Sequence, residues 1–381
     1  MDLNTIQTPA LLLDLEKFEC NCNWMKDKCA QLGVQLRPHL KTGKCIEFAR
    51  RQMTSSSGPA TVSTLAEAEY FFAHGVVDMI YAVGISPGKF ERVIKLLEDG
   101  CALKVILDNK DTARQFSAFC EERKTPCPVL IEIDADGHRS GVQPDSEDLI
   151  EIAKLLQGNA YFQGILTHAG DSYKCVGQEA CLHAQENERD ALVKCAERLK
   201  KAGFDCKIIS AGSTPTAVFA ESWSGVSEVR CGVYCLFDLV MAGLTVCTLD
   251  QIALSLLVEV IGHQAEKGWL ITDGGWMALS RDRGTAAQAV DQGYGIVCDI
   301  HGNPIDDLIV SGANQEHGII THRDGRKINP EEFPVGTRLR ILPNHACAMA
   351  AQHPQYFVLK NKKIVDIWNR IYGWQPKDLS L

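Results

Sequence analysis

Short apolar runs alternate with longer amphipathic segments from residue 34 to about residue 235. Helix-like stretches lie between most of the runs, at 90–98, 112–122 and 183–201. Eight runs have the apolar, β-branched composition of buried strands: 34–37, 60–63, 79–83, 103–107, 129–134, 162–167, 207–210 and 228–230. Eight strand–helix units predict an α/β fold with a closed (β/α)8 TIM barrel. The alternative, an open doubly wound sheet, would need a G-x-G-x-x-G turn after its first strand, and that turn is absent.

From about residue 250 the pattern changes to short strand-like runs that Gly, Pro, Asn and Asp separate. These runs lie at 252–261, 269–272, 295–300, 308–310, 318–321, 338–342, 356–359 and 363–368. Residues 8–14 precede the barrel and can join this region. We therefore predict a barrel domain over residues 15–240 and a mostly β domain over residues 241–381, together with residues 1–14.

Composition narrows the class of protein. The formal net charge of −9 argues against non-specific nucleic-acid binding, because such binding depends on cationic surfaces. No apolar run approaches the length of about 18 residues that indicates a membrane span, and the N-terminus lacks a signal-peptide pattern. We therefore expect a cytoplasmic protein that binds neither nucleic acid nor membrane. The 16 cysteines are scattered along predicted helices and strands, and we interpret them as mostly reduced, buried thiols.

Polar, glycine-rich segments follow six of the predicted barrel strands. The active site of a TIM barrel lies at the carboxyl ends of its strands, so these segments should meet at one rim. They are residues 37–42, 63–64, 136–141, 167–173, 211–216 and 230–234. Six polar segments in equivalent positions predict an active site rather than a set of ordinary turns.

Two features of this rim suggest cofactor chemistry. Lys41 lies just past the first strand, where a lysine can form a Schiff base and later act as a base, or can simply be a surface residue. Gly212-Ser213-Thr214 and Gly232-Val233-Tyr234 follow the last two strands, where TIM barrels often bind phosphate. Glycine lets backbone N–H groups approach an anion, and hydroxyl groups donate to it. The alternative is a pair of capped turns.

Three more side chains of the rim have two interpretations each. Arg139 could reach the ring of a bound cofactor with its charged guanidinium, or form a salt bridge within the barrel. His168 and Tyr173 could stack on the ring or flank it. His168 could equally be a core histidine bound to neighbouring backbone.

His345-Ala346-Cys347 follows a predicted strand and the turn Pro343-Asn344. Two side chains at positions i and i+2 of an extended chain point the same way. Imidazole nitrogen and thiolate are ligands that suit Zn²⁺, and a catalytic zinc keeps a position open for water or substrate. The alternative is a loop histidine next to a buried thiol.

A family resemblance joins these motifs. Leu36-Arg37-Pro38-His39-Leu40-Lys41-Thr42 resembles the RPHxKT signature of metal-activated, fold-type III pyridoxal-phosphate enzymes: the eukaryotic-type D-serine dehydratases, the D-threonine aldolases and the D-threo-3-hydroxyaspartate dehydratases. The similarity covers nearly the whole chain. It includes Thr8-Pro9-Ala10, Thr64-Leu65-Ala66-Glu67-Ala68-Glu69, His138-Arg139-Ser140-Gly141-Val142, His168-Ala169-Gly170, Ser213-Thr214-Pro215-Thr216 and Pro343-Asn344-His345-Ala346-Cys347. The His-x-Cys ending resembles the zinc site of D-serine dehydratases, whereas the aldolases tend to show His-x-Asp there.

The resemblance implies an alanine-racemase-like barrel with a β domain, in a homodimer. It implies that Lys41 carries the cofactor and that His345 and Cys347 hold zinc. The remaining cofactor-binding residues that we predict are Arg139, His168, Tyr173, Ser213, Thr214, Gly232 and Tyr234. One position departs from the family, because Gly43 stands where the signature usually continues with histidine.

The implied function is pyridoxal-phosphate- and zinc-dependent dehydration of D-serine to pyruvate and ammonia, a lyase reaction of D-amino acid metabolism. Lys41 would take the α-proton, the cofactor ring would accept the electrons, and zinc would act as a Lewis acid on the β-hydroxyl. The alternatives within the family are D-threonine aldolase and D-threo-3-hydroxyaspartate dehydratase activity. An alternative of another class is a non-catalytic pyridoxal-phosphate carrier, against which the additional β domain argues.

Overall fold

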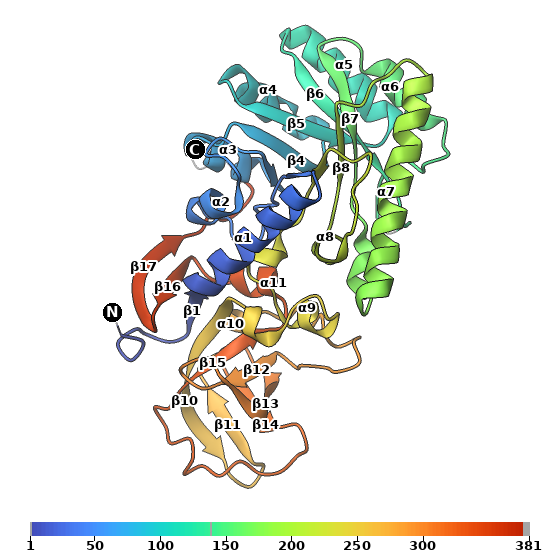
Figure 1. Ribbon diagram of the computed structural model, residues 1–381. Coiled ribbons are helices and arrows are strands. Elements are labelled where there is room, and N and C mark those ends of the chain that lie inside the picture. Colours follow the sequence, from blue (N-terminus) through green and yellow to red (C-terminus); the bar gives the residue numbers. More distant parts are fainter. Residues whose placement is uncertain (1, 138, 376–381) are drawn as a thin grey trace. The chain divides into compact units, whose positions relative to one another are not determined.

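The computed structural model describes residues 2–137 and 139–375 of the 381-residue chain, so His138 of the predicted rim lies outside the described residues. The chain divides into two compact units (Figure 1). One unit comprises Asn23–Gly232 with the tail from Gly373, and the other comprises Met1–Cys22 with Val233–Tyr372. Among the described residues, no helix combines the length and the apolar character needed to cross a membrane.

The first unit is built on a parallel sheet that closes into a barrel. Its strands follow one another in the order β2-β9-β8-β7-β6-β5-β4-β3. A parallel bridge between His39 and Thr61 joins the two ends of this order. The strands are β2 (Gln35–Leu36), β3 (Ala60–Val62), β4 (Asp78–Gly84), β5 (Ala102–Leu107), β6 (Cys127–Ile133), β7 (Ala160–Thr167), β8 (Ile208–Ala211) and β9 (Glu228–Val229). The predicted barrel is therefore confirmed, and the open sheet is not formed.

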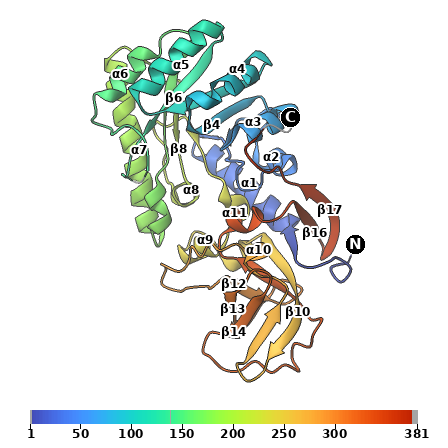
Figure 2. The same cartoon turned by 180° about the vertical axis from the view of Figure 1, so that it is seen from behind.

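Helices alternate with these strands and pack outside them (Figure 2). They are α1 (Leu15–Gln31), α2 (Ile46–Gln52), α3 (Leu65–Ala73), α4 (Phe90–Glu98), α5 (Lys110–Arg123), α6 (Asp148–Leu155), α7 (Gln178–Lys201) and α8 (Thr214–Phe219). Helix α4 buries Phe90, Val93 and Ile94, the spacing of an amphipathic helix that faces a sheet. Side-chain caps begin several helices: Thr64 accepts the Glu67 N–H before α3, and Asn109 accepts the Thr112 N–H before α5.

The core of the barrel unit follows from the alternation of side chains along its strands. Ile80, Ile106, Leu130, Leu166 and Ile208 come from the consecutive strands β4 to β8 and pack into one cluster. All of them are at most 9% exposed. Burial of such side chains is the main favourable contribution to folding, and it leaves the polar loops at the strand ends free for chemistry.

The second unit is an antiparallel sheet with one parallel pair, β1–β16. The sheet order is β11-β14-β13-β12-β15-β10-β1-β16-β17, and β11 also pairs with β10, so that six of the strands close on themselves. Its strands are β1 (Ala10–Asp14), β10 (Leu254–Gln264), β11 (Trp269–Thr272), β12 (Gly295–Cys298), β13 (Pro304–Ala313), β14 (Gly318–His322), β15 (Arg338–Pro343), β16 (Gln355–Lys360) and β17 (Lys363–Asn369). Strand β1, from the N-terminal segment, pairs with β10 and β16 of this sheet. Short helices α9 (Leu239–Gly243), α10 (Trp276–Leu279) and α11 (Ala346–Ala350) connect the strands.

Candidate active site

The loop after β2 presents Lys41 at the carboxyl end of the barrel. On one side the Leu40 N–H donates to the Thr61 carbonyl (2.9 Å), and on the other the His39 N–H donates to the segment after β9 (2.8 Å). The Lys44 N–H then donates to the Leu40 carbonyl (2.9 Å) and closes a turn. These bonds fix the loop to both neighbouring strands, so the position of Lys41 is set by the barrel ladder.

Two lysines lie in this loop, and their surroundings differ. Lys44 Nζ pairs with the buried Glu67 carboxylate at 3.0 Å. Lys41 is exposed, and among the described residues its ammonium group has no ion-pair partner. The amine of Lys41 is therefore available to react with an aldehyde, whereas Lys44 is held by a carboxylate.

Neutral histidines and a buried arginine lie near Lys41. Burial is the main cause that lowers the pKa of His168 to about 3, and the charges of Lys41 and Arg230 lower it further. The same causes hold the pKa of His39 well below its usual range. Both imidazoles are thus neutral at pH 7, so the positive charge of this region comes from the lysine and the arginine. This combination suits a ligand that carries negative charge.

Arg230 is fixed inside the mouth of the barrel. Its Nε donates to Ser210 Oγ at 2.8 Å, and its Nη2 donates to the Thr167 carbonyl. Ser210 Oγ in turn donates to the Glu228 carboxylate at 2.7 Å. The guanidinium therefore ties the ends of β7, β8 and β9 together and brings a permanent positive charge to the site.

Arg139 and Tyr173 lie on two other loops of the rim. The Arg139 guanidinium is 3.6 Å from the buried Glu132 carboxylate, and 58% of the arginine side chain is exposed. Tyr173 lies in the 3-10 helix Gly170–Lys174, and its ring centroid is 6.1 Å from that of His168. The salt-bridge alternative for Arg139 is thus present, as a long and exposed ion pair that contributes little stability.

The predicted phosphate loop after β8 uses two of its backbone donors internally. The Gly212 N–H donates to the Glu188 carboxylate (2.8 Å), and the Ser213 N–H donates to Thr216 Oγ1 (3.0 Å). Ser213 Oγ caps α8 and lies within hydrogen-bond distance of neighbouring hydroxyls. Thr214 Oγ1, in contrast, is buried and has no hydrogen-bond partner among the described residues. Because α8 has only six residues, this hydroxyl is a better candidate for the phosphate than a helix dipole.

Two glycines let the loops around this hydroxyl approach one another closely. A Cβ atom at Gly212 would lie 2.9 Å from the Arg230 backbone nitrogen. A Cβ atom at Gly232 would lie 2.8 Å from the His39 carbonyl oxygen. Larger residues would separate the loops after β2, β8 and β9. The backbone cradle, the unpaired Thr214 hydroxyl and the neighbouring cations fit the phosphate and the aldehyde of pyridoxal phosphate.

The other unit contains Tyr234, His345 and Cys347. Tyr234 is fully buried in the 3-10 helix Val233–Cys235. His345 Nδ1 lies 2.7 Å from Asp282 Oδ2. Burial lowers the pKa of His345, but its hydrogen bonds with Asp282 and Cys347 outweigh burial and raise the pKa above its usual value.

The donors of this group fit zinc. A metal-binding histidine usually donates its other ring nitrogen to a carboxylate, and Asp282 is placed to accept from His345. Cysteine sulfur, as in Cys347, and a second imidazole nitrogen are donors that zinc prefers. Among the described residues, no group of three or more His, Cys, Asp or Glu side chains could hold a metal ion.

The backbone around this pair is held by buried polar side chains. Asn344 Nδ2 donates to Thr285 Oγ1 and to the Gly293 carbonyl, both at 2.7 Å. The Ala346 N–H donates to the buried Asp238 carboxylate at 2.8 Å. These bonds fix the residues on either side of His345, which makes the orientation of the imidazole a property of the fold.

Two family models match the chain and together cover most of it. The model described as "Alanine racemase, N-terminal domain" matches residues 13–239, and the model described as "Putative serine dehydratase domain" matches residues 253–359. The chain belongs to the alanine racemase-like family. Membership supports pyridoxal phosphate as the cofactor and confirms the expected fold of a barrel with a β domain.

Curated relatives of this alanine racemase-like chain include dehydratases. The D-threo-3-hydroxyaspartate dehydratase of Delftia sp. (strain HT23) is 47% identical over 98% of this chain and 99% of its own length. The D-serine dehydratase of Dictyostelium discoideum is 29% identical over 94% of this chain and 95% of its own length. These comparisons support a lyase. They favour the alternative substrate named above, D-threo-3-hydroxyaspartate, over D-serine.

A solved structure has the same fold. It is a D-threo-3-hydroxyaspartate dehydratase, a cysteine-to-alanine mutant in the metal-free form. Its TM-score is 0.96 at 47% identity, and the match covers 98% of this chain and 100% of that one. The likeness extends over both units of the alanine racemase-like chain.

Sequence reasoning missed His39, Arg230 and Glu188 as members of the site. In the sequence, Arg230 is only the last residue of a predicted strand, and His39 is only one position of the signature. Glu188 gave one signal, because it lies on the same face of the α7 helix as Cys181 and Leu192, which are buried. A carboxylate on the buried face of a helix needs hydrogen-bond partners, and its partners are the loops of the active site.

Proposed function

We propose that the chain is a pyridoxal-phosphate- and zinc-dependent lyase that dehydrates a D-3-hydroxy amino acid, with D-threo-3-hydroxyaspartate as the preferred substrate. The observation that carries the proposal is the free amine of Lys41 in the signature loop. It stands beside a backbone cradle with an unpaired Thr214 hydroxyl. The substrate is proposed because the relative that is 47% identical acts, by its name, on D-threo-3-hydroxyaspartate.

The barrel residues described above would bind the cofactor and move a proton. When bound, pyridoxal phosphate supplies an electron sink for the bonds at Cα. The Lys41 amine would hold the cofactor and would take the proton from Cα of the substrate. Thr214 and the glycine-lined loops would hold the phosphate. Arg230 keeps positive charge near the anionic groups, and neutral His168 and His39 add none.

The pair of His345 and Cys347 would hold zinc. When bound, the ion would supply a Lewis acid for the oxygen that leaves Cβ, because hydroxide is a poor leaving group. A relative's structure described as a cysteine-to-alanine mutant in the metal-free form supports a metal bound through cysteine in this family. Loss of water across Cα–Cβ, followed by hydrolysis, would yield a 2-oxo acid and ammonia.

The decisive experiment is a product assay with purified protein on D-threo-3-hydroxyaspartate, D-serine and D-threonine. We expect ammonia and oxaloacetate from the first substrate at the highest kcat/KM. A higher kcat/KM for pyruvate formation from D-serine would establish D-serine as the substrate, a candidate favoured by the match to a serine dehydratase domain. Glycine and an aldehyde would indicate an aldolase. Absence of any turnover would favour a carrier of pyridoxal phosphate.

The cofactor assignment has its own test. Borohydride reduction followed by peptide mapping should place the cofactor on Lys41. Lys44 is the internal control, because it lies in the same loop but is paired with Glu67. A label on Lys44, or no label, would refute the role of Lys41.

A further inference from the structure

Glu188 is a buried carboxylate in the middle of α7, and only 1% of it is exposed. Its Oε1 accepts the Gly212 N–H at 2.8 Å and the Ala169 N–H at 3.3 Å. Its Oε2 accepts the Thr216 hydroxyl at 3.0 Å. The carboxylate therefore connects the loop after β7, the loop after β8 and the first turn of α8.

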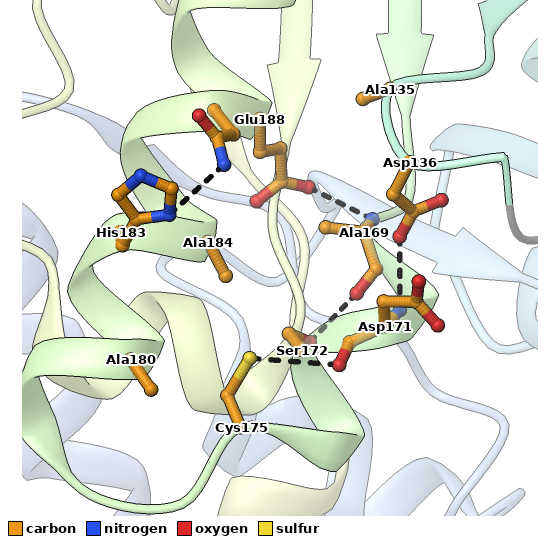
Figure 3. Close-up of a pocket in the computed structure, with 11 residues that line it drawn as sticks. Ala135, Asp136, Ala169, Asp171, Ser172, Cys175, Ala180, His183, Ala184 and Glu188 are labelled. Atoms are coloured by element: carbon orange, nitrogen blue, oxygen red, sulfur yellow. Dashed lines mark hydrogen bonds between the residues drawn. The ribbon is translucent and has the colours of Figure 1, made fainter.

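Glu188 and Ala169 also border a cavity. A cavity of about 420 Å³ lies between α7 and the loops after β6 and β7 (Figure 3). Alanine side chains at positions 169, 180 and 184 form part of its wall. Small side chains leave the loops without the interlocking contacts that fix most buried segments. The bond from the Ala169 N–H to Glu188 therefore helps to hold the loop after β7 at the edge of this cavity.

The residues bonded to Glu188 are neighbours of the residues that would bind the cofactor. Gly212 is held by Glu188 through its N–H, and its backbone is also a hydrogen-bond partner of His168. Thr216 accepts the Ser213 N–H, so the residues on both sides of Thr214 are fixed. The unpaired Thr214 hydroxyl is thus aimed by neighbours that Glu188 holds in place.

We propose that Glu188 is a positioning residue for the cofactor phosphate, acting through Gly212 and Thr216 to aim the Thr214 hydroxyl and the His168 ring. The inference rests on the proposed function, since it requires pyridoxal phosphate as the ligand. Glu188 makes no contact with the phosphate itself, because its oxygens are engaged by the loop donors. Its removal leaves two buried N–H groups without partners, and such groups strongly favour rearrangement of the loop.

The test compares the affinity of four proteins for pyridoxal phosphate: wild type, Glu188→Ala, Glu188→Gln and Asn187→Ala. Asn187 is the matched control, because it lines the same cavity from the preceding position of α7, while its side chain bonds, among the described residues, to His183 alone. We expect Glu188→Ala to weaken binding about tenfold or more, since each bond to a charged group contributes roughly a factor of ten. Glu188→Gln should stay within about threefold of wild type, because its amide oxygen still accepts the two N–H groups.

Phosphorus NMR of the bound cofactor supplies a readout that a purely structural role would not change. In Glu188→Ala the phosphate resonance should move toward that of free pyridoxal phosphate, while Asn187→Ala should keep the wild-type position. A folded Glu188→Ala protein with wild-type affinity and an unchanged resonance would overturn the inference.

A milder variant covers the case in which Glu188→Ala does not fold. Thr216→Val removes one of the three bonds to Glu188 and should weaken binding partially, with a smaller shift of the phosphate resonance. Wild-type behaviour of this folded variant would also overturn the inference. Failure of the wild-type protein to bind pyridoxal phosphate would instead refute the proposed function, so the two failures are distinguishable.

Discussion

At the scale of single residues, Gly43 shows how the surroundings limit a substitution. A Cβ atom at Gly43 would lie 2.4 Å from Cδ1 and 3.0 Å from Cβ of Phe48. Phe48 is buried, and its Cβ cannot move away without the helix that carries it. The phenylalanine thus occupies the space that a side chain at position 43 would need, which explains locally why glycine stands in place of the family's histidine.

We therefore expect Gly43→Ala to lower the free energy of unfolding by about 1–3 kcal/mol, the usual cost of overpacking a buried site. Gly43→His should reduce cofactor retention as well, because the signature loop must shift. Urea denaturation measures the first effect. The double variant Gly43→Ala/Phe48→Leu should recover part of the loss. Equal stability of Gly43→Ala and wild type would show that the loop yields without cost.

The stability of the protein should depend on pH through His168. In the folded protein, burial and then the charges of Lys41 and Arg230 lower the pKa of His168 to about 3. The unfolded histidine binds a proton near pH 6.5. The unfolded state therefore binds more protons between these values, so stability is full above about pH 6.5 and falls as the pH decreases toward 3. We expect His168→Gln to reduce the loss of unfolding free energy between pH 7 and 5, on the order of 1 kcal/mol, in denaturation of the cofactor-free protein. An unchanged pH slope would contradict this.

At the scale of elements, the N-terminal caps of α3 and α5 use the same type of hydrogen bond, so that the loss of one can be compared with the loss of the other. Thr64 accepts the Glu67 N–H, and the Glu67 carboxylate accepts the Ser63 N–H and pairs with Lys44 of the signature loop. Asn109 caps α5 with a similar bond from Thr112, and its Nδ2 donates to Asp108, whose carboxylate accepts the Gly141 N–H. Among the described residues, the cap of α3 is therefore the one of this pair that is linked to the signature loop.

Thr64→Ala and Asn109→Ala should each lower the free energy of unfolding by about 1 kcal/mol, the typical cost of losing a cap. Only Thr64→Ala should also weaken the retention of pyridoxal phosphate, because Glu67 then loses its orientation toward Lys44. Dialysis with absorbance readings of the bound cofactor measures this retention. Equal cofactor loss in both variants would mean that general destabilisation, and not the link through Glu67, is the cause.

At the scale of the whole molecule, the two proposed groups of ligands belong to different units. Lys41 and Thr214 lie in the barrel unit, and His345 and Cys347 lie in the β unit. Removal of the metal should therefore leave the cofactor bound. Chelation, His345→Ala or Cys347→Ala should lower 2-oxo acid formation on the order of 10²-fold, since a Lewis acid contributes several kcal/mol to departure of the hydroxyl.

The measurement pairs the visible absorbance of the bound cofactor with the rate of product formation. Cys20→Ala is the control, because Cys20 is an exposed thiol of the same unit and should change neither quantity. Verified metal-free protein that dehydrates its substrate at the full rate would refute the zinc assignment. His345 and Cys347 would then be a histidine and a thiol held by Asp282 and their loop.

The sequence by itself was sufficient for the local features. The amphipathic spacing over 90–98 matches α4, and even the two-residue strands β2 and β9 fall within predicted runs. Periodicity and the signature loop are short-range properties, because side-chain alternation along a strand is set by its own backbone. The signature loop is likewise a local pattern, and the prediction for Lys41 rests on its resemblance to the family's signature.

Only the tertiary structure decided which segments meet. The order of the antiparallel strands, the link from Glu188 to Gly212 and the bonds of Arg230 to Ser210 and Thr167 join residues far apart in the chain. No local pattern encodes such pairs, because their free energy depends on burial and hydrogen-bond geometry that exist only after the barrel has closed. The sequence determined which segments form most of the strands and helices, and it marked Lys41 as the candidate reactive amine. The closed fold determined which buried groups hold that lysine's surroundings in place.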